Sequence, residues 1–253
     1  MRTGKTIPVG ISNRHFHLSH DDLERLFGSG YQLTRLRDIT QIGQFAAQET
    51  LDVIGPAGTI TGIRIVGPVR ERTQLELAAS DAHVLGISPP VRYSGDLDGS
   101  ACVRLRGPAG EIDLHEGVII PIRHLHLSPG DAREFGLHNG ARVQIAPAQR
   151  PQFDTCNEPR PVIFDNVLVR VSPTFVAEFH IDIDEANASG LRNGDPVRII
   201  GLSELDRMAR KSVITERDVR TAILQGRRIK PVPGAVITPA AKDLAREHGI
   251  FDE

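Results

Sequence analysis

Short runs of apolar residues, many of them alternating with polar ones, recur along the chain up to about residue 200. Glycine, proline or polar residues bound each run. Such runs are typical of β-strands, because successive side chains of a strand point to opposite faces. One turn sequence, Gly-Pro-Ala-Gly, occurs twice, at 55–58 and 107–110, and predicts two related hairpins. The clearest predicted strands are 6–12, 50–54, 60–66, 74–77, 102–106 and 111–114.

A second pattern predicts a short helix that recurs along the chain. In each copy an acidic residue opens one or two helical turns, a glycine ends them, and a new strand follows. The first copy is expected to begin at the N-cap Ser19 and to end at Gly28 in the left-handed conformation. Repetition at 50–60 residues favours two related β-barrels over a solenoid. The four copies are 21–27, 81–87, 131–137 and 184–191.

The predicted fold class is therefore mainly β, with two related β-barrel domains capped by short α-helices. We expect the first barrel in 1–100, with strand exchange from later segments, and the second in 101–203. The tail, 204–253, has a helical texture. Thr215 is expected to cap one helix of this tail, and Thr238 a second helix with Pro239 at its first position.

Composition narrows the class of protein. The 253 residues are 40% hydrophobic and 25% charged, which is normal for a soluble globular chain. The net charge of −2 gives no reason to expect nucleic acid or an anionic membrane as a partner. No apolar run approaches the length of a membrane span. Cys102 and Cys156 form no disulfide framework and lie in no nucleophile motif, which favours a cytoplasmic setting.

The most informative motif is a duplicated pair of histidines. Arg-His-Phe-His-Leu-Ser at 14–19 returns as Arg-His-Leu-His-Leu-Ser at 123–128. Residues i and i+2 of a strand share a face, so each pair can present two imidazoles side by side, which suits a metal ion. The other histidines, 20, 83, 115, 138 and 248, follow no such pattern and are expected to be ordinary surface or core residues.

The repeat extends this motif to four equivalent positions, each two residues before a helix cap. These positions hold His17, Glu76, His126 and His180, and two residues earlier lie His15, Gln74, His124 and Glu178. Imidazole-rich ligation favours zinc, with cobalt or nickel as substitutes. The set exceeds what one zinc ion takes, so two metals a few ångströms apart are expected. The predicted metal ligands are His15, His17, Glu76, His124, His126 and His180.

A turn rich in arginine lies just before Glu76. Arg70 and Arg72 alternate with Gln74 and Glu76, so all four would share one face of an extended segment. An arginine there can bind a phosphate or carboxylate, and the alternative is a solvated surface pair. Arg14 and Arg123 would point to the opposite face, where salt bridges to structural carboxylates are expected. No phosphate-binding loop, dinucleotide motif or nucleophile elbow occurs in the chain.

Six segments, in order between about residues 6 and 200, have long and specific sequences. They are Ile-Pro-Val-Gly-Ile-Ser-Asn-Arg-His-Phe-His-Leu-Ser at 7–19, Gly-Gln-Phe-Ala-Ala-Gln-Glu-Thr at 43–50, Gly-Pro-Val-Arg at 67–70, Pro-Pro-Val-Arg-Tyr-Ser-Gly-Asp-Leu at 89–97, Arg-His-Leu-His at 123–126, and Phe-Asp-Asn-Val-Leu-Val-Arg-Val at 164–171. Together they resemble one family, the PduL-type phosphotransacylases (phosphate propanoyltransferases) of bacterial microcompartments.

The resemblance implies two helix-capped barrels with a dinuclear zinc site between them, and it implies the same six metal ligands. It further implies that Arg70, rather than Arg72, contacts phosphate as the catalytic residue. The implied reaction interconverts acyl-CoA plus phosphate with acyl phosphate plus CoA, inside a microcompartment with shell or core enzymes as partners. The residues that bind CoA, the acyl chain length and the oligomeric state, a homodimer included, stay open.

Two alternative functions and three departures from the family remain at this point. A zinc-dependent acyl-CoA hydrolase would use the same metals on water, and a non-catalytic scaffold would use zinc only to staple the barrels. The amphipathic encapsulation peptide of many members is not expected here, because about six residues precede the first strand. The loop 146–161 is expanded relative to the family, and 204–253 is either a targeting module or a structural extension.

Overall fold

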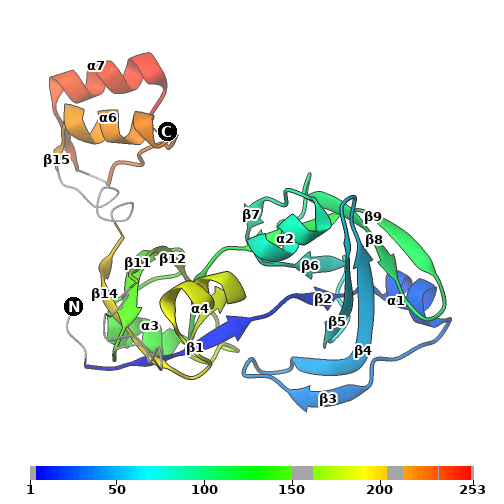
Figure 1. Cartoon of the computed structure of the whole chain (residues 1–253). Coiled ribbons are helices and arrows are strands. Elements are labelled where there is room, and N and C mark those ends of the chain that lie inside the picture. Colours follow the sequence, from blue (N-terminus) through cyan, green and yellow to red (C-terminus); the bar gives the residue numbers. More distant parts are fainter. Residues whose placement is uncertain (1–3, 150–161, 204–212, 233, 252–253) are drawn as a thin grey trace.

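The computed structural model describes residues 4–149, 162–203, 213–232 and 234–251. Two β-barrels lie one after the other, and a small helical extension lies apart from them at the C-terminus (Figure 1). The predicted fold class, mainly β with two barrels and short helices, is thereby confirmed. Within the described residues, no helix is long and apolar enough to cross a membrane.

Six strands close the first barrel in the order β4-β5-β2-β6-β9-β8, with β8 returning to β4. Two of its contacts are parallel, β2 with β5 and β6 with β9, and the hairpins β4–β5 and β8–β9 supply antiparallel ones. The strands are β2 (His15–His17), β4 (Phe45–Ile54), β5 (Thr59–Gly67), β6 (Gln74–Glu76), β8 (Ala101–Arg106) and β9 (Glu111–Pro121), with β3 (Arg35–Asp38) and β7 (Val91–Arg92) added at β4 and β9.

The second barrel closes in the order β1-β13-β10-β12-β11-β14. Its parallel contacts are β1 with β13 and β10 with β12, and the two central strands β10 and β13 run antiparallel. The strands are β1 (Ile7–Ser12), β10 (His124–Leu127), β11 (Arg142–Pro147), β12 (Phe164–Val171), β13 (Glu178–Asp182) and β14 (Pro196–Leu202).

The two barrels exchange strands more extensively than a boundary at residue 100 implies. The N-terminal strand β1 belongs to the second barrel, where it pairs with β13 and β14. The hairpin β8–β9, which lies beyond residue 100, completes the first barrel. The first barrel therefore takes its strands from 15–121, and the second from 7–12 and 124–202.

One short helix comes directly after each of the four central strands. The N-cap of every one lies two residues after a predicted metal ligand, as the repeat indicates. Ser19, Ser128 and Asp182 each accept a hydrogen bond from the backbone N–H three residues on. The helices are α1 (His20–Phe27), α2 (Ala79–Leu85), α3 (Pro129–Phe135) and α4 (Ile183–Ser189).

The expected left-handed end at Gly28 is wrong. Its φ of 108° and ψ of 155° lie outside the left-handed helical region, whereas Gly86, Gly136 and Gly190 at the other three helix ends do adopt it. A glycine after a predicted helix therefore does not by itself fix the conformation in which the helix ends.

The two Gly-Pro-Ala-Gly hairpins each bind the end of a helix. The N–H of Ala57 donates to the carbonyl of Leu85 on α2 at 3.0 Å, and the N–H of Ala109 donates to the carbonyl of Leu26 on α1 at 2.9 Å. A Cβ at Gly107 would lie 2.4 Å from the Leu26 oxygen, so only glycine permits this approach. The repeated turn sequence thus repeats a tertiary contact.

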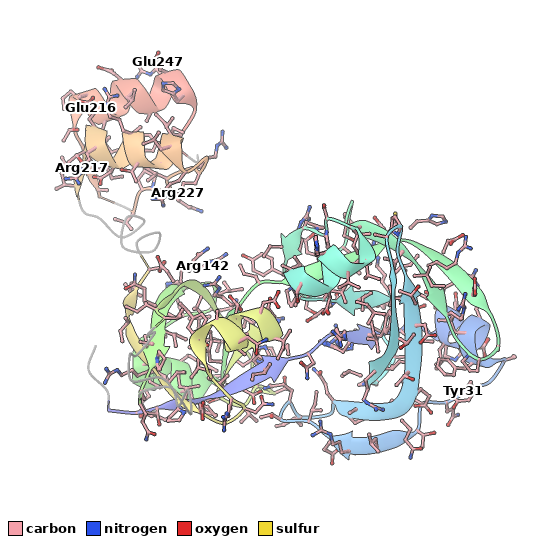
Figure 2. All side chains as sticks on the ribbon, in the orientation of Figure 1. Tyr31, Arg142, Glu216, Arg217, Arg227 and Glu247 are labelled. Carbon is pink, nitrogen blue, oxygen red and sulfur yellow. The ribbon has the colours of Figure 1, made fainter. Side chains whose placement is uncertain are left out.

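Each barrel encloses its own apolar core, as the side chains drawn in Figure 2 illustrate.

One buried carboxylate forms hydrogen bonds within the first barrel. Glu49 on β4 accepts hydrogen bonds from the Tyr31 hydroxyl at 3.0 Å and from the Thr34 N–H. Burial alone would raise the pKa of Glu49, but these hydrogen bonds outweigh it and hold the pKa below its usual range.

The C-terminal extension packs around a separate core. Helix α6 (Glu216–Leu224) lies against α7 (Pro239–His248), and the strands β15 (Val213–Ile214) and β16 (Val236–Ile237) pair in parallel. Thr238 caps α7 and Pro239 occupies its first turn, as predicted. The buried core consists of Ile214, Val219, Ala222, Ile229, Ala241, Ala245 and Ile250.

Candidate active site and metal centre

The same strand arrangement occurs once in each barrel and positions the predicted ligands. In the first barrel β2 and β6 are antiparallel, with His15 opposite Glu76. In the second barrel β10 and β13 are antiparallel, with His124 opposite His180. Each of these pairs lies beside a second one, His17 with Gln74 and His126 with Glu178. The repeat therefore places the six predicted ligands in two groups of three.

The first group consists of His15, His17 and Glu76, whose ligand atoms all lie within 4.8 Å of one another. The Nδ1 atom of His15 lies 2.8 Å from the carbonyl of Asn13, and Nδ1 of His17 lies 3.0 Å from the carbonyl of Val66. A carbonyl can only accept, so both Nδ1 atoms carry the proton. Their Nε2 atoms keep a lone pair, which is the form that binds a metal.

The second group consists of His124, His126 and His180, again with ligand atoms within 4.8 Å. His124 donates from Nδ1 to the carbonyl of Ile122 at 2.9 Å, which leaves its Nε2 free. Both ring nitrogens of His126 are buried without a hydrogen-bond partner. The Nε2 of His180 lies 2.9 Å from a carboxylate oxygen of Glu178, without the geometry of a hydrogen bond.

These groups fit metal ions by their chemistry. A buried imidazole with no partner is costly, and His126 has none among the described residues. Two histidines with a carboxylate and three histidines are both donor sets that catalytic zinc takes, with a position left for a substrate. The backbone carbonyls that orient His15, His17 and His124 supply the second shell that such ligands usually have.

The electrostatics keep the imidazoles neutral. Burial, followed by repulsion from His15 and Arg70, lowers the pKa of His17 to about 2. Burial and the neighbouring His124, His180 and Arg170 lower the pKa of His126 to about 2 in the same way. Burial and His180 lower the pKa of His124 to about 3. These rings are therefore neutral at pH 7, the protonation state that a metal ion requires.

The two groups are electrostatic neighbours. Glu76 of the first group attracts the protonated form of His124 in the second, an effect that partly offsets the burial of that histidine. Glu76 also interacts with Arg70 and with Arg170, and the two arginines repel each other. Two groups of potential metal ligands and two cationic side chains are thus electrostatically coupled.

A hydrogen-bond network joins Arg70 to the first group. Nη1 of Arg70 donates to the Ser94 hydroxyl at 3.3 Å, and the side-chain amide of Gln74 donates to the same hydroxyl at 2.9 Å. Gln74 also donates to Glu76 Oε1 at 2.6 Å. The backbone N–H of Gly95 donates to Gln74 at 2.7 Å and fixes its orientation. Arg70 forms no ion pair with a carboxylate among the described residues, so its charge remains available to an anion.

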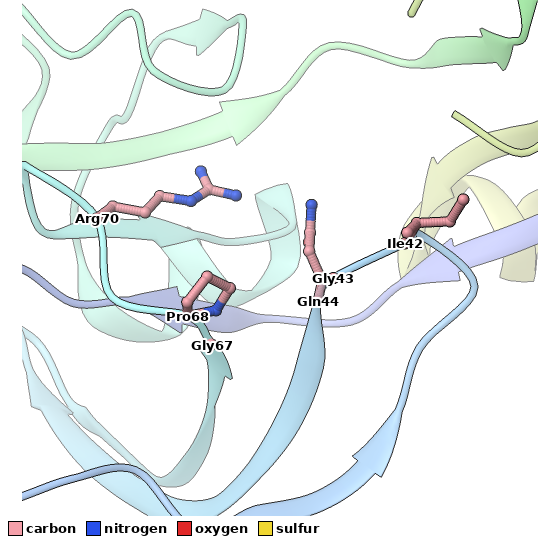
Figure 3. A pocket seen from close by; sticks show the side chains of 6 residues that line it. All are labelled: Ile42, Gly43, Gln44, Gly67, Pro68 and Arg70. Atoms are coloured by element: carbon pink, nitrogen blue, oxygen red, sulfur yellow. The ribbon is translucent and has the colours of Figure 1, made fainter. Parts of the chain in front are cut away.

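A pocket of about 210 Å³ opens beside Arg70. Figure 3 shows the side chains of Arg70 and Gln44 extending into the same space, with Ile42 farther along the turn between β3 and β4. Burial lowers the pKa of the Arg70 guanidinium, and Glu76 partly compensates. The group stays charged, because a guanidinium is effectively never deprotonated in a protein.

The expectation that Arg72 shares the face of Arg70 is wrong. Arg72 lies on the surface, where it contacts Asp98 at 2.9 Å and also pairs with Glu116. Strand β6 begins only at Gln74, so the alternation of an extended strand does not reach back to the arginines. Arg72 is therefore a surface arginine, which was the alternative to an anion-binding role.

The arginines that precede the histidine pairs behave as predicted. Arg14 pairs with Asp81 in the first turn of α2, and Arg123 pairs with Glu185 in the first turn of α4 at 2.7 Å. Each therefore ties a ligand-bearing strand to the helix after its partner strand.

Arg170 is a site residue to which the sequence pattern assigned no role. It lies on β12 in register with His126, and it acts on His124 and on Arg70 through its charge. It forms no ion pair among the described residues, and its guanidinium lies 5.5 Å from the ring of Phe175, which stacks on His126. The only signal was its place in the family-like segment 164–171. Cys102 is exposed on β8, and Cys156 lies outside the described residues, as does the predicted loop 146–161 from residue 150 onward.

Fold and site together define a two-barrel protein in which two groups of potential metal ligands lie beside two half-buried arginines. Comparison with known proteins gives the family. A family model described as phosphate propanoyltransferase matches residues 8–192. The chain belongs to this family and is accordingly an acyltransferase, as the resemblance of its motifs indicated.

Three relatives illustrate the match. The chain is 46% identical over 200 residues to the phosphate propanoyltransferase of Thermotoga maritima, covering 79% of this chain and 91% of the relative. It is 44% identical to that of Rhodobacter capsulatus over 193 residues, 76% of this chain and 86% of the relative. It is 46% identical to that of Shewanella putrefaciens over 193 residues, 76% of this chain and 87% of the relative. The C-terminal extension lies beyond the part that the family model matches.

Proposed function

We propose that the protein interconverts a short-chain acyl-CoA plus phosphate with acyl phosphate plus CoA. The oxygen of HPO₄²⁻ bonds to the acyl carbon, the carbon–sulfur bond breaks, and the phosphate proton leaves on the thiol of CoA. One observation supports this most strongly. Two groups of potential metal ligands lie beside two arginines that have no carboxylate partner among the described residues, in a chain of the phosphate propanoyltransferase family.

The proposed site holds two zinc ions, one on His15, His17 and Glu76 and one on His124, His126 and His180. Cobalt or nickel can substitute on the same nitrogen-rich ligands. Bound zinc supplies Lewis acidity and a fixed position for substrate oxygen atoms. Gln74 holds the carboxylate of Glu76 through its 2.6 Å hydrogen bond, and the carbonyl partners of the histidines hold the rings.

Arg70 is the proposed catalytic residue. Its planar fork matches two phosphate oxygens, and Ser94 steadies it from the side. A phosphate held in this way faces the thioester without loss of orientation entropy at the moment of reaction. No base is needed to activate the nucleophile, because phosphate is already an anion. The charge of Arg170 lies near enough to act on the same anion, and we assign it a supporting role.

The test is CoA release from acetyl-, propionyl- and butyryl-CoA with and without phosphate, with a metal count on the same sample. Release that depends on phosphate supports the proposal. Release at the same rate without phosphate would instead identify a zinc-dependent acyl-CoA hydrolase. If chelation unfolds the protein and no turnover is seen at any phosphate concentration, zinc has only a structural role, one ion within each barrel.

We further propose that the enzyme works inside a bacterial microcompartment and that the extension docks it to shell or core enzymes. The support is that the extension forms a core of its own, separate from the cores of the barrels, and lies beyond the family match. Deleting 204–253 should leave the kinetic constants unchanged and abolish co-purification with shell proteins. Unchanged co-purification would mean that the extension is only structural.

A further inference from the structure

Glu178 is a buried carboxylate for which the proposed reaction has no use. Only 8% of its surface is exposed, and its side chain passes over Gly10, where an added Cβ would lie 2.7 Å from the Glu178 carboxyl carbon. Its Oε2 lies 2.9 Å from Nε2 of His180. A carboxylate buried to this extent needs hydrogen-bond donors from the protein.

One of these donors comes from the other barrel. Gln41, itself only 6% exposed, donates from its side-chain amide to Glu178 Oε2 at 3.2 Å. Its amide oxygen accepts the backbone N–H of Val176 at 3.4 Å. These partners fix the orientation of the amide, because a carboxylate only accepts and an N–H only donates. Gln41 thus bridges two points of the second barrel from the turn between β3 and β4.

The same turn lines the pocket beside Arg70. Ile42, Gly43 and Gln44 come directly after Gln41 and form one wall of that pocket (Figure 3). The turn is closed by the N–H of Gln44, which donates to the carbonyl of Gln41 at 3.2 Å. One side of the turn is therefore anchored on the second barrel, and the other side faces the anion that Arg70 is proposed to bind.

We propose that Gln41 is a positioning residue, which latches the β3–β4 turn to Glu178 and thereby sets the wall of the phosphate pocket against the His180 side of the site. In its kinetic part this inference rests on the proposed function. The hydrogen bond joins a pocket wall of the first barrel to Glu178 of the second barrel, which contacts the proposed metal ligand His180. The position of this wall therefore depends on how the two barrels are arranged.

The experiment compares Gln41→Ala with Gln48→Ala as a matched control. Gln48 lies on β4 of the same hairpin, is exposed, and its side chain has no hydrogen-bond partner among the described residues. For Gln41→Ala we expect the KM for phosphate to rise about tenfold with kcat little changed, because binding is lost equally in ground and transition states. Hydrogen exchange should become faster in the turn 39–44. Neither quantity should change in Gln48→Ala.

Two further variants keep the outcome decisive. Gln41→Glu still accepts from Val176 but cannot donate to Glu178, so it should behave like Gln41→Ala if the latch is the cause. In a Glu178→Gln background, Gln41→Ala should add less than twofold to the exchange rate. Faster exchange with an unchanged KM would mean a merely structural contact and would overturn the proposal, as would wild-type exchange in Gln41→Ala. If the wild-type protein shows no phosphate-dependent CoA release, the proposed function fails, while the exchange rates still decide on the latch.

Discussion

The assignment of Arg70 leads to a prediction with a quantitative control inside the same turn. Arg70→Ala removes a half-buried guanidinium that has one weak contact, the 3.3 Å hydrogen bond to Ser94, and no carboxylate partner among the described residues. Little native structure depends on the side chain, so the fold should survive. What is lost is the interaction with the phosphate, both in the bound state and as charge develops in the transition state.

The expected loss in kcat/KM depends on the number and kind of hydrogen bonds between Arg70 and the phosphate. A guanidinium fork makes two charge-assisted hydrogen bonds to phosphate, each worth about 1.5–3 kcal/mol where water is largely excluded. Arg70 is only partly buried, and Arg170 still attracts the anion, so we take about 3–4 kcal/mol for the pair of bonds. This corresponds to a loss of about 10²–10³ in kcat/KM for phosphate. Arg70→Lys keeps the charge but not the fork and should lose about tenfold.

The assay is phosphate-dependent CoA release at fixed acyl-CoA and varied phosphate, with far-UV circular dichroism and a metal count for each variant. Arg72→Ala is the control, because Arg72 lies two residues away but pairs with Asp98 and Glu116 on the surface. Its kinetics should match those of the wild type. Equal effects of the two alanine variants, or an Arg70→Ala variant with wild-type kcat/KM, would refute the assignment of the phosphate clamp.

Three further outcomes are expected. His126→Ala should lower the zinc content from about two ions to about one per chain, measured by plasma mass spectrometry, with the first group still loaded. Glu49→Gln should cost about 1–2 kcal/mol of unfolding free energy at pH 7; since the folded pKa is lowered, the difference from wild type should be full above about pH 5 and vanish as pH falls through that pKa, which urea titrations would show. Gly107→Ala should cost about 3 kcal/mol, because the new Cβ meets the Leu26 carbonyl, whereas Gly4→Ala should leave the thermal midpoint unchanged.

What the sequence predicted well is what the repeat encodes locally. Four of the six candidate ligands occupy the same strand position, two residues before a helix cap, and the other two, His15 and His124, lie two residues earlier on the same strand face, so periodicity within a strand and the recurrent helix cap were enough to select them. The repeat placed Glu76 beside His15 and His17 although it is not a histidine, because its position in the unit is the same. Arg14 and Arg123 were placed correctly by the same alternation of faces.

What the sequence did not reveal depends on pairing between distant segments. Arg170 reaches the site because β12 lies in register beside β10, and Gln41 reaches Glu178 because a turn of one barrel meets a strand of the other. The surface position of Arg72 depends on acidic partners 26 and 44 residues away. Register and inter-barrel contact are set by the whole core, so no local pattern contains them.

The exchange of strands between the barrels has a consequence for how the chain is made. Every strand of the first barrel precedes residue 122, so that barrel can close while the ribosome is still adding the rest. Strand β1, although synthesised before all the others, has to wait for β13 and β14, more than 160 residues later. During that interval β1 is an unpaired apolar segment, which can pair with strands other than its native partners. If the gene were divided between the barrels, the N-terminal half would carry β1 without its pairing strands, and the C-terminal half would lack the strand that closes its barrel. The complete site therefore requires one continuous chain.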